Sequence, residues 1–99
     1  MKQIERIKAM ERQLNRASKA VMRLSAALDD YVAAQEAIRE LSAYYDSGDW
    51  KQDFADDEQG RLPKNLKRGV LSEDGIWNML TDNRDLHTRM KEILKTTKL

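Results

Sequence analysis

The chain has 99 residues, of which 40% are hydrophobic and 35% charged, and its formal net charge is +1. A chain of this length buries one core but hardly two, and the absence of cysteine excludes a disulfide framework, a thiolate nucleophile and a cysteine zinc site. No apolar run reaches the roughly 18 residues of a membrane span or forms a signal peptide, so we expect a single soluble, cytoplasmic domain.

Residues 1–47 contain neither glycine nor proline, and their apolar positions alternate in spacings of three and four. This stripe consists of Ile7, Met10, Leu14, Ala17, Val21, Leu24, Leu28 and Tyr31, followed by Gln35, Ile38 and Tyr45. The heptad spacing predicts one helix over about 2–45, which at 1.5 Å per residue would be roughly 65 Å long.

The segment after this helix contains several residues that interrupt regular structure. We expect Gly48 to end the helix in the left-handed conformation, and Asp49 to cap a short helix over about 50–59. A loop over about 60–71 follows, because glycine and proline recur there.

The last segment predicts a helix over about 72–95. Ser72 is a suitable N-cap, and the acidic Glu73 and Asp74 suit the first turn. The residues expected to face inward are Ile76, Leu80, Met90 and Leu94. The predicted fold class is therefore all-α: a helical hairpin or bundle with coiled-coil character, in which the long N-terminal helix packs antiparallel on the C-terminal helix and a short helix and loop lie between them.

The lengths of these two helices do not match. The C-terminal helix would span only about 36 Å, so it would leave much of the N-terminal apolar stripe uncovered. A second copy of the long helix would cover the rest, which predicts a homodimer, parallel or antiparallel. The candidate dimer seam consists of Leu14, Val21, Leu24 and Leu28.

Charge is distributed unevenly along the chain. Residues 1–24 carry seven basic and two acidic side chains, residues 25–60 two basic and ten acidic, and residues 61–99 nine basic and five acidic. A basic ridge opposite the apolar stripe consists of Lys8, Arg12, Arg16, Lys19 and Arg23. Nucleic-acid binding by this ridge is an alternative that we disfavour against a solvated helix face, because aromatic residues are absent there.

Five of the six aromatic residues lie between residues 44 and 77, where the helices meet the irregular connection. They are most simply a small local core, and the alternative is a peptide or small-ligand pocket, which could include an enzymatic site. The candidate binding surface consists of Tyr45, Trp50, Phe54, Lys67, Arg68, Asp74 and Trp77. Within it we expect pairing of Arg68 with Asp74, or of Lys67 with Glu73, rather than a phosphate site.

No set of residues resembles a catalytic or metal-binding motif. The acidic residues between 46 and 58 are not in the register of an EF-hand loop. His87 is the only histidine and has no recognisable nucleophile motif beside it. We therefore expect no metal and no cofactor, and enzymatic activity is the less favoured interpretation.

Three stretches, YYDSGDW, LPKNLKRGVLSED and IWNMLTDNRDL, carry a resemblance to a known family. Over nearly its whole length the chain resembles small bacterial proteins grouped as a domain of unknown function, number 4298. The resemblance implies no activity, substrate or cofactor, but it directs attention to two loops and to Trp50, Arg68 and Asp74. We expect a non-enzymatic protein–protein interaction or structural module with an unknown protein partner; the dimer orientation stays open at this point.

Overall fold

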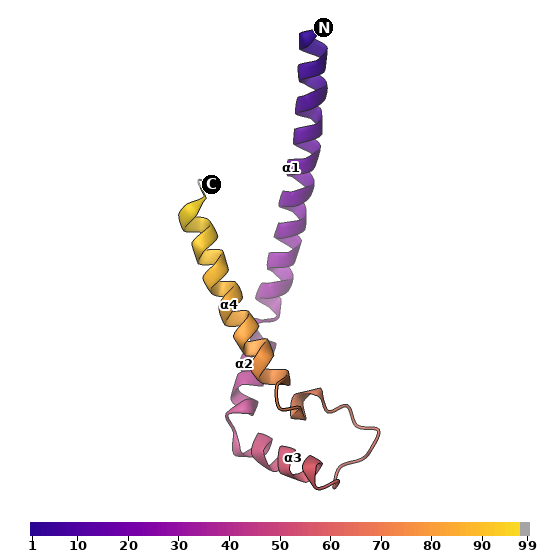
Figure 1. Cartoon of the computed structure of the whole chain (residues 1–99), viewed down its shortest axis with the longest axis vertical. Helices are drawn as coiled ribbons and strands as arrows, with labels where there is room; N and C mark the ends of the chain where they lie inside the picture. Colours follow the sequence, from indigo (N-terminus) through magenta and orange to yellow (C-terminus); the bar gives the residue numbers. More distant parts are fainter. Residues whose placement is uncertain (98–99) are drawn as a thin grey trace. The chain divides into compact units, whose positions relative to one another are not determined.

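The computed structural model describes residues 1–97, and within this range the chain contains helices and no strand (Figure 1). The elements are α1 (Lys2–Ala33), α2 (Gln35–Tyr45), α3 (Gly48–Glu58), the short 3₁₀ helix η1 (Gly69–Leu71) and α4 (Gly75–Thr96). The all-α fold class is thus confirmed, with a long first helix, two short middle helices and a long last helix.

The chain divides into two compact units, unit 1 (Met1–Glu36) and unit 2 (Ala37–Leu99). Unit 1 consists of α1 and the first residues of α2, and unit 2 contains the rest of α2 and the later helices. The expected single domain, and the expected packing of the N-terminal helix on the C-terminal helix, concern the relation between these units and stay predictions.

The helix expected over 2–45 is divided at Ala34 into α1 and α2. In a regular α-helix the carbonyl of Tyr31 accepts the backbone N–H of Gln35. Here the side-chain amide of Gln35 donates to that carbonyl at 3.1 Å, and the backbone N–H of Ala34 donates to it at 3.2 Å. The heptad pattern did not predict this interruption because it arises from one polar side chain that competes for a backbone acceptor.

Helix α3 begins two residues earlier than expected, and its cap is Ser47 rather than Asp49. The Ser47 hydroxyl accepts the backbone N–H of Trp50 at 3.3 Å and donates to the carbonyl of Tyr44 at 2.6 Å. Gly48 is therefore the first helical residue and does not adopt the expected left-handed conformation. The left-handed glycine is Gly60, with φ of 70°, in the turn that follows α3.

Helix α4 begins at Gly75, three residues later than expected. Ser72 does cap a turn, because its hydroxyl accepts the backbone N–H of Gly75 at 3.0 Å and donates to the carbonyl of Gly69 at 2.8 Å. This tight turn joins η1 to α4, so Glu73 and Asp74 lie before the helix rather than in its first turn.

The core of unit 2 is small. Among the described residues only Leu71 of η1 and Ile76 of α4 are fully buried, with 6% and 3% of their surface exposed. η1 packs against both α3 and α4, so this short turn is the centre of the unit. Ile76 faces inward as predicted, whereas Leu94 is 66% exposed near the end of α4, contrary to the prediction.

Gly75 and Gly48 form a matched pair, since each is the first residue of a helix. A Cβ atom at Gly75 would overlap the carbonyl oxygen of Gly69 and lie 2.6 Å from the Ser72 hydroxyl, whereas a Cβ at Gly48 meets no atom within 4 Å. We expect Gly75→Ala to lower the free energy of unfolding by about 1–3 kcal/mol. Gly48→Ala should leave it unchanged or raise it by up to about 1 kcal/mol. Urea denaturation followed by circular dichroism measures both, and equal stabilities of the two variants would contradict the prediction.

Candidate interaction surfaces

The heptad face of α1 consists of Ile7, Met10, Leu14, Ala17, Val21, Leu24, Leu28 and Tyr31. No residue of α1 is buried in the chain. The four predicted seam residues are exposed to 62% at Leu14, 68% at Val21, 61% at Leu24 and 42% at Leu28. The sequence thus supplies the apolar face of an amphipathic helix, and the chain as described leaves this face open to solvent.

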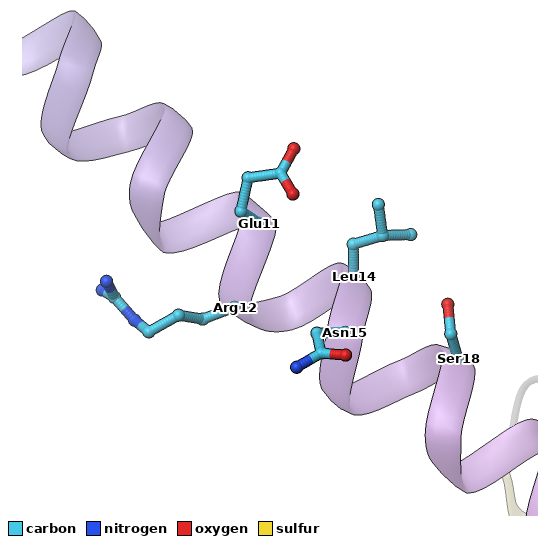
Figure 2. Close-up of a pocket in the computed structure, with 5 residues that line it drawn as sticks. All are labelled: Glu11, Arg12, Leu14, Asn15 and Ser18. Atoms are coloured by element: carbon cyan, nitrogen blue, oxygen red, sulfur yellow. The ribbon is translucent and has the colours of Figure 1, made fainter.

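A shallow hollow on α1 is lined by residues of that helix alone, and Figure 2 shows their side chains projecting from successive turns. Glu11, Leu14, Asn15 and Ser18 are spaced i, i+3, i+4 and i+7. Arg12 also lines the hollow, and only Leu14 among the lining residues belongs to the heptad face. One helix supplies only one wall, so the hollow does not enclose a small ligand.

Three of the predicted aromatic residues contact one another in unit 2. The rings of Tyr45 and Trp50 meet edge to face, with centroids 4.8 Å apart, and Trp50 stacks on Phe54 at 5.3 Å. The indole N–H of Trp50 donates to the carbonyl of Val70 at 2.8 Å. Trp50 therefore joins the end of α2, helix α3 and η1, as a local core would. Trp77 lies on α4 and is 55% exposed.

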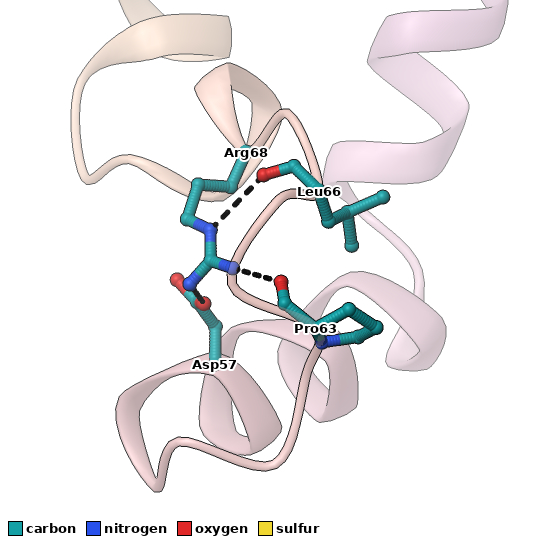
Figure 3. Close-up of polar contacts among 4 residues, drawn as sticks. All are labelled: Asp57, Pro63, Leu66 and Arg68. Carbon is teal, nitrogen blue, oxygen red and sulfur yellow. Dashed lines mark hydrogen bonds and ion pairs between the residues drawn. The ribbon is translucent and has the colours of Figure 1, made fainter.

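Arg68 holds the loop between α3 and η1 (Figure 3). Its Nη1 atom lies 2.5 Å from the carboxylate of Asp57 on α3, its Nε donates to the carbonyl of Leu66 at 3.3 Å, and its Nη2 donates to the carbonyl of Pro63. All three guanidinium nitrogens thus donate within the chain, which is a structural use rather than a ligand site.

The expected pairing of Arg68 with Asp74 is wrong, because the acidic partner of Arg68 is Asp57. Asp57 is eleven residues away, and the loop must fold back on α3 before the two side chains meet. The alternative pairing of Lys67 with Glu73 does not occur among the ion pairs of the described residues. The sequence contains several acidic residues between 46 and 58, and nothing local marks Asp57 as the partner of Arg68.

A second polar contact that the sequence did not indicate joins α2 to α3. The hydroxyl of Tyr44 donates to the carboxylate of Asp53 at 2.6 Å. Burial, the hydrogen bond to Asp53 and the negative charges of Asp53 and Asp49 together raise the pKa of Tyr44 to about 12, with burial the largest cause. The neutral phenol is thus a structural link between the two helices.

This raised pKa predicts a loss of stability in alkaline solution. An ordinary phenol ionises near pH 10, so the contribution of Tyr44 is complete below about pH 10 and disappears as the pH rises toward about 12. We expect the free energy of unfolding to fall over this window in the wild type and to fall less in Tyr44→Phe. Tyrosinate absorbance, taken as the difference between the two proteins, should show one phenol titrating near pH 12. A difference titration centred at pH 10 would contradict the contact.

An open hollow of about 340 Å³ lies beside the core of unit 2. Its lining consists of Leu41, Lys67, Gly69, Val70, Gly75, Ile76 and Met79. Lys67 is the only candidate surface residue among them, and it contributes the single charge. The candidate surface therefore does not form one site: three of its aromatic residues form a stack, Arg68 closes a loop, Asp74 precedes α4 and Trp77 lies exposed on that helix.

Residues 1–97 contain no cluster of metal-ligating side chains. No three histidine or acidic side chains in that range lie close enough together to hold a metal ion. His87, the only histidine, lies exposed on α4. No helix in the same range has the length and apolar character needed to cross a membrane.

A family model described as "Domain of unknown function (DUF4298)" matches residues 7–93, and the resemblance seen in the sequence is thereby confirmed. The matched region contains the heptad face, the aromatic stack and the Arg68 loop. No curated protein and no solved structure matches the chain.

Proposed function

The chain belongs to the DUF4298 family, and we propose that it is a non-enzymatic protein–protein interaction module that forms a homodimer through the heptad face of α1. The observation that carries this proposal is the exposure of that face from Ile7 to Leu28, with Tyr31 half-buried at its end. Eight positions in unbroken heptad spacing run from Ile7 to Tyr31, and none of them is buried within the chain. Soluble monomers rarely expose a continuous apolar surface of this length.

The lack of packing around α1 also supports the binding of a partner. An isolated helix gains little stability from backbone propensity alone, and most helices in proteins are stabilised by packing of their apolar face. α1 has 32 residues and no buried side chain, so nothing described within the chain supplies that packing. A second copy would supply it with the same heptad spacing, which is the requirement for side chains to insert between turns.

Unit 2 supports an interaction role in a different way. Among its described residues the core consists of two buried side chains and an aromatic stack, and its polar contacts join its own elements to one another. The apolar hollow beside Ile76 and the exposed Trp77 are the surfaces on which we place a further protein partner.

The first test is the mass of the protein in solution, measured by light scattering over a range of concentrations. The proposal predicts twice the chain mass of 11.5 kDa at high concentration, with dissociation on dilution. A particle of 11.5 kDa at every concentration would refute the dimer.

A further inference from the structure

We infer that the second copy lies antiparallel against α1, in the register that places Leu14 of one chain opposite Leu24 of the other. This inference rests on the proposed dimer and adds its orientation. The pairing of the heptad positions and two apolar side chains beside the heptad face support it.

Charge changes sign along unit 1. Residues 1–24 carry seven basic and two acidic side chains, whereas residues 25–36 carry Asp29, Asp30 and Glu36 and no basic residue. These charged side chains lie mainly on the side of α1 away from the heptad face, as the basic ridge does, and salt screens exposed charges over about 8 Å at physiological ionic strength. Charge therefore does not decide the orientation.

The heptad face fits this orientation over its whole length. In antiparallel coiled coils the first apolar position of each heptad meets the second of the partner helix. With Leu14 opposite Leu24, the remaining layers join Ile7 to Tyr31, Met10 to Leu28 and Ala17 to Val21, each occurring twice by symmetry. All eight layers then lie inside α1, so no apolar position of the face is left without a counterpart.

Ile4 and Val32 decide between the two orientations. Both lie on α1 beside the heptad face at the same heptad position, Ile4 three residues before Ile7 and Val32 one residue after Tyr31, and they are 47% and 69% exposed. In an antiparallel pair that flanking position meets its own equivalent, so Ile4 of each chain lies beside Val32 of the other. In a parallel pair the same position faces the opposite flank, where Ile4 has no counterpart and Val32 meets Ala27. The antiparallel register therefore covers two apolar side chains that the parallel one leaves exposed.

The chain contains no cysteine, so single cysteines report the orientation directly. Ile4→Cys and Val32→Cys chains are mixed, unfolded, refolded together and treated with a short thiol-specific cross-linker, and the products are identified by peptide mass. Residues 4 and 32 are roughly 42 Å apart along one helix, so a short cross-linker joins them only between antiparallel chains. We expect the Ile4→Cys chain to be linked to the Val32→Cys chain and neither variant to be linked to itself. Lys19→Cys, on the outer face of α1, is the control and should give only background linkage with either chain.

Light scattering and cross-linking test the dimer and its orientation separately. Light scattering on the same mixture first establishes whether the chains associate. A monomer overturns both the proposed function and this inference. A dimer in which Ile4→Cys is linked to itself, or in which the two cysteines are not linked, overturns the antiparallel register and leaves the proposed dimer standing.

Discussion

Replacing both Leu24 and Leu28 by Asp is expected to convert the dimer into monomers. Burying one leucine side chain contributes about 1.5–3 kcal/mol, and the double substitution removes four such side chains from each dimer. It also places carboxylates in an apolar seam where no cation faces them. A loss of only about 4 kcal/mol would already weaken association about a thousandfold. Light scattering at a concentration where the wild type is dimeric measures the effect.

Ala26→Asp is the matched control for this substitution. Ala26 lies between the two leucines on the opposite, exposed side of α1, so the substitution adds a carboxylate to the same part of the helix without entering the seam. The control should remain dimeric. Helicity measured by circular dichroism should fall in the leucine variant, since α1 loses the packing that stabilises it, and should be retained in the control. A leucine variant that stays dimeric and fully helical would remove the heptad face as the interface.

The second large effect is expected at Trp50 in unit 2. Trp50→Ala removes the ring that contacts both Tyr45 and Phe54, and it leaves the carbonyl of Val70 without the indole donor. Fully buried tryptophans cost about 3–5 kcal/mol when replaced by alanine, and Trp50 is half-buried, so we expect a loss of about 2 kcal/mol in the free energy of unfolding. Urea denaturation at a fixed protein concentration measures it, because the stability of a dimer depends on concentration.

Trp77→Ala is the control for Trp50→Ala. Trp77 is the other tryptophan of the chain and is 55% exposed on α4. We expect its replacement to change stability by about 0.5 kcal/mol or less, as is usual for exposed side chains. If the two variants were equally stable, the aromatic stack would not be the link between α3 and η1. A larger loss at Trp77 than at Trp50 would show that Trp77 is covered by another surface in solution.

The features that were correctly predicted are those with a local cause. Heptad spacing predicted the α1 helix because side chains three and four residues apart share one face of any helix, whatever surrounds it. The aromatic cluster was predicted in part, since Trp50 and Phe54 are one turn apart on α3 and Tyr45 ends the preceding helix, whereas Trp77, expected in the same local core, is exposed on α4.

Helix ends were predicted less well. Asp49 and Ser72 were both expected to cap the helices that follow them, and both are residues that favour caps. Ser47 replaces Asp49 because its hydroxyl reaches Trp50, and Ser72 caps a turn that η1 places before α4. Several residues near the start of each helix can act as its N-cap. The packing of the neighbouring segments decides which of them does so.

The sequence by itself determined the helical class, the heptad face of α1 and the approximate extent of the helices after residue 47, because periodicity and breaking residues act within a few positions of one another; it did not indicate the division at Ala34. Only the tertiary structure decided that Arg68 pairs with Asp57, that Tyr44 donates to Asp53 and that Trp50 donates to Val70. These partners are nine to twenty residues apart, and each has several chemically equivalent alternatives in the sequence. These pairs form only once the loop has folded back on α3 and η1 has packed against α3 and α4. No local sequence pattern indicates which pairs will result.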